Sequence, residues 1–197
     1  MSRTAEIQRQ TKETDIRLAL NLDGSGKADI RTGIGFLDHM MDAFTRHGLF
    51  DLKLSVKGDL EVDGHHSAED TAIVLGEAIR KALGDKKGIR RYGYFILPMD
   101  EALVLCAIDL CDRPYFVFDG EEKITAPMVG GLDTQLVREF FYSVSYAAGM
   151  NLHFRILSGS NSHHIIEAMF KAFAKSLDMA AGMDERIEGV LSTKGVL

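Results

Sequence analysis

The chain has 197 residues, of which 46% are hydrophobic and 26% charged, as in an average globular domain. Its 23 Lys and Arg against 29 Asp and Glu give a net charge of −6, which argues against a general nucleic-acid or anionic-membrane surface. No apolar run is long enough to span a membrane, and the polar start lacks a secretory pattern, so we expect a cytoplasmic protein with neither nucleic acid nor membrane as partner. Two cysteines, Cys106 and Cys111, are too few for a disulfide framework and are predicted to be buried thiols.

The predicted elements of the first half come in the order strand, strand, helix, strand, helix. The two opening strands lie near residues 5–10 and 16–22, and the third covers 52–56. The first helix runs roughly from Phe36 to His47. The second helix carries apolar residues at four-residue spacing, namely Leu75, Ile79 and Leu83.

The second half repeats this order. Strands are predicted at 92–98, 102–110 and 152–157, with one helix before the last strand and one after it. The apolar positions that mark these helices are Leu132, Leu136, Phe140 and Val144, and then Met169, Phe173 and Leu177. With only 3 prolines and no linker-like segment, the sequence predicts a single α+β domain over residues 1–197. We expect it to be internally duplicated, with repeats of about 1–88 and 89–197 that each pack a small mixed β-sheet on two helices.

The string His65-His66-Ser67-Ala68-Glu69 recurs 98 residues later as His163-His164-Ile165-Ile166-Glu167. Residues four apart share one face of a helix, so the first His and the Glu of each copy can bind one cation. The second His of each copy points about a third of a turn away, so two metals are the simpler solution. A single pair of histidines would more often cap a helix, but the duplication favours metal binding.

The repeat also points to further ligands. His39 lies 26 residues before the first histidine pair, and its counterpart is Glu139, 24 residues before the second pair and on the equivalent helix. A carboxylate can replace an imidazole as a ligand. The candidate metal ligands are therefore His39, His65, His66, Glu69, Glu139, His163, His164 and Glu167. Shared between two ions, they give each about four protein groups and leave room for exogenous ligands.

At these motifs the chain resembles the imidazoleglycerol-phosphate dehydratase family over essentially its whole length. The further residues that carry the resemblance are Thr11-Lys12-Glu13-Thr14, Gly35-Phe36-Leu37-Asp38-His39-Met40, Asp109-Leu110-Cys111-Asp112-Arg113-Pro114 and Ser192-Thr193-Lys194-Gly195. The resemblance implies a ribosomal protein S5 domain 2-like fold and conversion of a phosphorylated imidazole, imidazoleglycerol phosphate, to imidazoleacetol phosphate and water in histidine biosynthesis. It also implies two Mn²⁺ ions per active site and a homo-oligomer, a 24-mer with sites completed between subunits. Many relatives have His where this chain has Glu139.

The resemblance also implies roles for individual residues. Glu13 matches a glutamate of acid–base catalysis, and we take Glu13, Glu167 and His66 as the catalytic candidates. Arg91, Arg113 and the tail from Ser192 match phosphate-binding positions. The full set of predicted substrate-binding residues is Glu13, His39, His47, His65, Glu69, Arg91, Arg113, His163, Lys171, Ser192, Thr193 and Lys194. Composition alone would make Glu13 a solvated strand residue and the tail a disordered end.

Two other functions are compatible with the histidine motifs. A dinuclear metallohydrolase would use the same ligands to generate hydroxide and attack an ester or amide. A metal-storing assembly would need the ligands alone, and Glu13, Arg113 and the tail motif argue against it. Mixed His and carboxylate ligands suit zinc, iron and manganese alike, so manganese follows from the resemblance alone.

Overall fold

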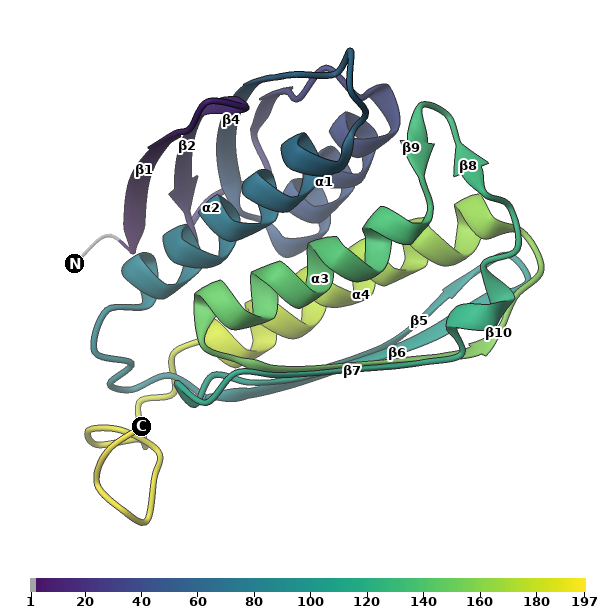
Figure 1. The fold of residues 1–197 in the computed structure, drawn as a ribbon. Helices are drawn as coiled ribbons and strands as arrows, with labels where there is room; N and C mark the ends of the chain where they lie inside the picture. Colours follow the sequence, from purple (N-terminus) through teal and green to yellow (C-terminus); the bar gives the residue numbers. More distant parts are fainter. Residues whose placement is uncertain (1–2) are drawn as a thin grey trace.

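The computed structural model describes residues 3–197, which form two similar halves facing each other (Figure 1). The first half contains β1 (Thr4–Gln10), β2 (Thr14–Asn21), β3 (Ala28–Arg31), α1 (Gly35–Gly48), β4 (Asp51–Gly58) and α2 (His65–Leu83). The second contains β5 (Tyr92–Met99), β6 (Ala102–Asp109), β7 (Tyr115–Asp119), the 3₁₀ turn Glu121–Lys123, β8 (Met128–Val129), β9 (Leu132–Asp133), α3 (Gln135–Ala148), β10 (Asn151–Ser158) and α4 (Ser162–Ala181). Among the described residues, no helix is long and apolar enough to cross a membrane.

Each half has one four-stranded sheet with the same topology. The strand orders are β1-β2-β4-β3 and β5-β6-β10-β7, and in each sheet the last strand runs parallel to its neighbour while the other pairs are antiparallel. The predicted α+β class, with a small mixed sheet on two helices in each half, is confirmed. In the first sheet Thr14 is paired with Gly58, so the β1–β2 turn lies beside the loop that leads into α2.

The four helices form the middle of the molecule, between the two sheets (Figure 1). Across the halves, α1 packs on α4 and α2 packs on α3. The Phe44 ring of α1 stacks on Phe173 of α4 at 5.6 Å between centroids, and Phe141 of α3 lies 4.6 Å from Phe154 of β10. Each buried Phe contributes about 1.5–3 kcal/mol. The fold is therefore stabilised by packing between the halves, as at Phe44 and Phe173, and by packing within the second half, as at Phe141 and Phe154.

All four helices begin at the same end of this layer. The Phe36 ring at the start of α1 lies 5.0 Å from the His163 ring at the start of α4. A Cβ on Gly64, just before α2, would come within 3.6 Å of Leu136 at the start of α3. The positive ends of four helix dipoles therefore meet where the histidine motifs begin.

Most predicted elements are present, and the structure differs from the expectation at Leu132 and at two short strands. Leu132 is not in a helix, because it belongs to the β8–β9 hairpin and α3 begins only at Gln135. It is nevertheless buried, so its spacing from Leu136 reflects burial and not a helical turn. β3 and β7 were not predicted, since each is short and pairs in parallel with a strand far along the chain. Cys106 and Cys111 are buried and free, as predicted, and burial raises the pKa of Cys106 to about 12.

Candidate functional site

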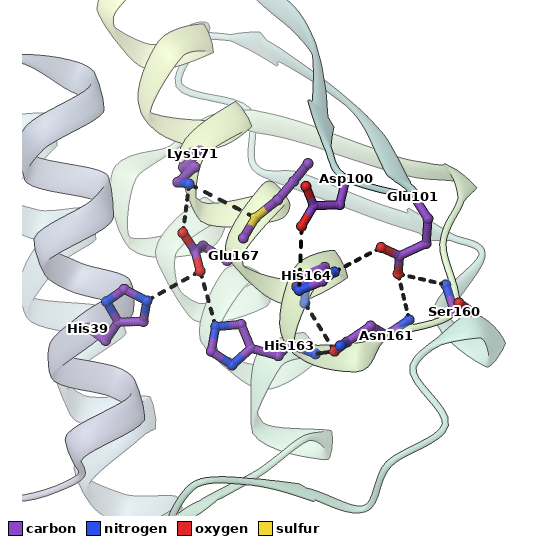
Figure 2. A network of polar contacts seen from close by, with 10 residues as sticks. His39, Asp100, Glu101, Ser160, Asn161, His163, His164, Glu167 and Lys171 are labelled. Carbon is purple, nitrogen blue, oxygen red and sulfur yellow. Dashed lines mark hydrogen bonds and ion pairs between the residues drawn. The ribbon is translucent and has the colours of Figure 1, made fainter.

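One cluster joins the two halves at the helix N-termini. His39 on α1 and His163 on α4 both face Glu167, one turn further along α4 (Figure 2). The Glu167 Oε2 atom lies 3.2 Å from His39 Nε2 and 3.1 Å from His163 Nε2. One ligand atom from each of the three residues lies within 4.8 Å of the others, which is close enough for a single cation to contact all three.

Glu167 is the buried member of this cluster, whereas His39 is exposed. Its other oxygen, Oε1, lies 2.6 Å from Lys171 Nζ. Burial alone would raise the pKa of the Glu167 carboxyl, but the Lys171 ammonium and the hydrogen bonds to the two histidines hold it below its ordinary value. Glu167 is therefore an anion between two imidazoles, with Lys171 compensating its charge.

The other pair of helices, α2 and α3, carries a second, more open cluster. His65 Nε2 lies 3.7 Å from Glu69 Oε2 one turn along α2. Glu139 of α3 lines the same cavity as His65, a small hollow of about 200 Å³ that also includes Asp63 and Asp133. Glu139 thus faces α2 as His39 faces α4, because α1 pairs with α4 and α3 pairs with α2.

The second histidine of each motif points away from these clusters. The His65 and His66 rings are 6.2 Å apart and nearly perpendicular, and those of His163 and His164 are 6.1 Å apart in the same arrangement. A single chain therefore keeps the neighbouring histidines of each motif at separate positions, as the helical spacing predicts.

Each of these outward histidines contacts two carboxylates. His66 Nδ1 lies 3.0 Å from Asp59, and its Nε2 lies 3.8 Å from Glu13. His164 Nδ1 lies 2.8 Å from Glu101, and its Nε2 lies 3.8 Å from Asp100. The hydrogen bonds to Asp59 and Glu101 raise the pKa of the two imidazoles above the ordinary value. In return, His164 and the backbone N–H of Asn161 lower the pKa of Glu101 to about 2.

The predicted phosphate residues lie at the other end of the helices. The Arg91 backbone N–H donates to Ala180 O, 17 residues beyond His163 on α4 and therefore about 26 Å along the helix axis. Arg91 is buried and forms a double ion pair with Asp109, at 2.6 and 3.0 Å. It also lines an open hollow with Ser192 and Thr193.

Three further predicted residues have more open surroundings. Arg113 is exposed in the β6–β7 connection, three residues after Leu110, whose N–H donates to Arg91 O. Lys194 is exposed in the tail, which extends from the end of α4 (Figure 1). His47 is exposed near the end of α1, and partial desolvation together with the nearby Lys171 charge lowers its pKa.

Comparison with known proteins decides the family. A family model described as imidazoleglycerol-phosphate dehydratase matches residues 32–177. The chain belongs to the imidazoleglycerol-phosphate dehydratase family. It is 64% identical over 197 residues to the imidazoleglycerol-phosphate dehydratase of Lachnoclostridium phytofermentans and 59% identical over 197 residues to that of Acetivibrio thermocellus, covering 100% of each chain in both cases.

Solved structures of the same family have the same fold. The imidazoleglycerol-phosphate dehydratase of Staphylococcus aureus matches with a TM-score of 0.83 at 36% identity, covering 92% of this chain and 99% of that one. The Pyrococcus furiosus protein, solved in complex with (S)-C348, matches with a TM-score of 0.82 at 37% identity, covering 97% and 100%. The chain is therefore an enzyme, a dehydratase of histidine biosynthesis.

The sequence reasoning missed Asp59 and Glu101, the two carboxylates bound to Nδ1 of the outward histidines. Asp59 follows β4 and Glu101 lies in the β5–β6 turn, so neither belongs to a spaced motif. For Glu101, the internal repeat offered a cue, because Glu101 immediately precedes β6 as Glu13 immediately precedes β2.

Proposed function

We propose that the chain converts imidazoleglycerol phosphate to imidazoleacetol phosphate and water with two Mn²⁺ ions per active site. The observation that carries the metal dependence is the cluster of His39, His163 and Glu167, whose ligand atoms lie within 4.8 Å of one another. The duplicated motif supplies a related group in the other half, where His65 and Glu69 share a helix face and Glu139 lines the same hollow as His65.

The donor set fits divalent transition ions. Imidazole nitrogens and carboxylate oxygens are ordinary ligands for manganese, iron and zinc, and metal binding favours their deprotonated forms. Glu167 is already an anion held between two imidazoles. His66 and His164 have Nδ1 occupied by carboxylates, which leaves Nε2 as the ligand atom of each.

The reaction removes the hydroxyl from the carbon next to the imidazole ring and a proton from the following carbon. The two leave as water, and the resulting enol becomes the ketone when a proton returns to the ring-side carbon and the enol hydroxyl loses its own. Two ions bound by these residues would supply Lewis acidity that makes the ring N–H easier to deprotonate. A side chain in the site must still move the carbon-bound proton.

Glu13 is our candidate for that proton transfer. Its carboxylate is about half exposed, and Oε1 lies 3.8 Å from Nε2 of His66. A substrate bound at His66 would therefore approach a carboxylate able to accept or return a proton. Glu167 is less suited to proton transfer, because Lys171 and two histidines already contact its oxygens.

We further propose that the active site is completed between subunits of a homo-oligomer, the 24-mer implied by the family. Arg91 and the tail lie about 26 Å from His163 along α4, too far for one small phosphorylated substrate to contact both within one chain. A second subunit that places its Arg91, Arg113 and tail beside the histidine motifs would supply the positive charge a phosphate needs.

The metal assignment is tested by replacing one cluster histidine and one matched histidine outside the cluster. His163→Ala should remove most bound Mn²⁺ and most turnover together, measured by metal analysis of the purified protein and by ketone formation. His153→Ala is the control, since His153 is exposed on β10. If His163→Ala bound as much Mn²⁺ as the control, the cluster would not be a metal site.

A further inference from the structure

The two halves bind Nδ1 of their outward histidines with carboxylates from different positions in the repeat. In the second half the partner of His164 is Glu101, which immediately precedes β6. The residue at that position in the first half is Glu13, which immediately precedes β2. Glu13, however, does not bind Nδ1 of His66, because Asp59 already occupies that atom.

The position of Asp59 also differs between the two halves. Asp59 is the first residue after β4, and the first residue after β10 is Gly159, which has no side chain to offer. The same contact is therefore formed twice from non-equivalent loops. In the first half this leaves Glu13 beside Nε2 of His66, at 3.8 Å.

We infer that Asp59 and Glu101 are positioning residues that fix the proton of His66 and His164 on Nδ1, so that both histidines present an unprotonated Nε2 to the site. A carboxylate can only accept a hydrogen bond, so each imidazole must donate from Nδ1. The importance of Nε2 as a ligand atom rests on the proposed function. In the first half, Asp59 also frees Glu13 from this role.

Glu101 is held more firmly than Asp59. Its Oε1 accepts the backbone N–H groups of Ser160 and Asn161, at 3.2 and 2.8 Å, and its Oε2 accepts from His164 (Figure 2). Both oxygens of Asp59 face His66 Nδ1, at 3.2 and 3.0 Å, and among the described residues no backbone N–H donates to them.

This difference makes the two amide substitutions behave differently. In Glu101→Gln, the amide oxygen must stay with the two backbone N–H groups, so the amide NH₂ faces Nδ1 of His164. Nδ1 then has to accept, and the proton moves to Nε2. In Asp59→Asn, the amide is free to turn its oxygen to His66, so the Nδ1–H form persists. Asp59→Ala removes the acceptor and should allow the Nε2–H form of His66.

The test is ¹⁵N NMR of histidine-labelled, full-length chain after chelation, at a pH where the imidazoles are neutral. Protonated and unprotonated ring nitrogens give separate signals, and His66→Gln and His164→Gln variants assign them. We expect Nδ1–H for both histidines in the wild type and Nε2–H for His164 in Glu101→Gln. Ser158→Ala, which removes a hydrogen bond to the Glu101 backbone carbonyl, is the control for a purely structural change of the turn.

Mn²⁺ titration of the same proteins gives the second readout. Glu101→Gln should weaken Mn²⁺ binding by about 10- to 100-fold, while Asp59→Asn and Ser158→Ala stay close to the wild type. An Nδ1–H signal for His164 that persists in Glu101→Gln would overturn the inference. A wild type that shows the expected tautomers but binds no Mn²⁺ would instead contradict the proposed function and leave the positioning role standing.

Discussion

At the scale of single residues, Glu13 and Glu101 show how one position in a repeat acquires two roles. Both immediately precede the second strand of a hairpin, yet Glu101 accepts three hydrogen bonds while Glu13 stays about half exposed beside His66. A carboxylate committed to neighbours is poorly placed to exchange protons with a substrate. An exposed one is well placed to do so.

The proposed role of Glu13 predicts a separation between metal binding and turnover. Glu13→Gln should keep its bound Mn²⁺ but lose turnover by about 10²-fold or more, because the amide cannot accept the proton. Metal analysis and the initial rate of ketone formation measure the two effects. Glu77→Gln, an exposed position on α2, is the matched control. Full activity in Glu13→Gln would end the assignment.

The sequence indicated where some residues of the candidate site lie and gave no indication of others. The correspondence of His39 with Glu139 followed from the repeat, and the structure places each beside a histidine motif. Asp59 and Glu101 were not predictable, because their contacts depend on the paths of two loops and on which strand edges lie together. Periodicity carries no information about such paths.

At the scale of elements, the helices and the antiparallel strands of the two four-stranded sheets follow from local pattern, whereas the β8–β9 hairpin and the pairing of helices do not. Apolar spacing marks a buried face on each helix but does not say which helix covers it. Here α1 packs on α4 and α2 on α3, and this crossed pairing brings His39 to Glu167. The short parallel strands β3 and β7 depend on long-range pairing in the same way.

The contact between α2 and α3 depends on one glycine. A Cβ at Gly76 would lie 2.6 Å from Ala147 Cβ and 2.7 Å from the Val144 carbonyl oxygen, so the helices would have to separate. Gly76→Ala should therefore lower the free energy of unfolding by about 1–3 kcal/mol, despite the better helix propensity of Ala. Denaturant titration measures this, with Gly35→Ala as the control, because a Cβ at Gly35 meets nothing within 4 Å. Equal stability of both variants would show that the interface can open at no cost.

At the scale of the whole molecule, the sandwich of helices between two sheets separates the two kinds of predicted site residue. The histidine motifs gather where the helices begin, and Arg91 lies where α4 ends. The sequence could not reveal this separation, because it follows from the direction of the helices in the assembled fold. It is the reason a site shared between subunits is proposed.

Sharing between subunits predicts complementation. His163→Ala and Arg113→Ala chains should each be nearly inactive, because one lacks a cluster ligand and the other a phosphate-binding arginine. Mixed before assembly, they should regain part of the activity, since some sites receive intact residues from both kinds of chain. Ketone formation by the mixture, compared with each variant alone, measures this. A mixture no more active than its components would place the complete site within one chain.

The most direct test of the central claim is product formation by the full-length chain after chelation, with and without restored Mn²⁺. Given imidazoleglycerol phosphate, the enzyme with restored Mn²⁺ should form imidazoleacetol phosphate and release no inorganic phosphate. The enzyme without metal should form no imidazoleacetol phosphate and release no inorganic phosphate. Ketone formation at the same rate without metal would contradict the metal-dependent mechanism, and release of phosphate would indicate a hydrolase.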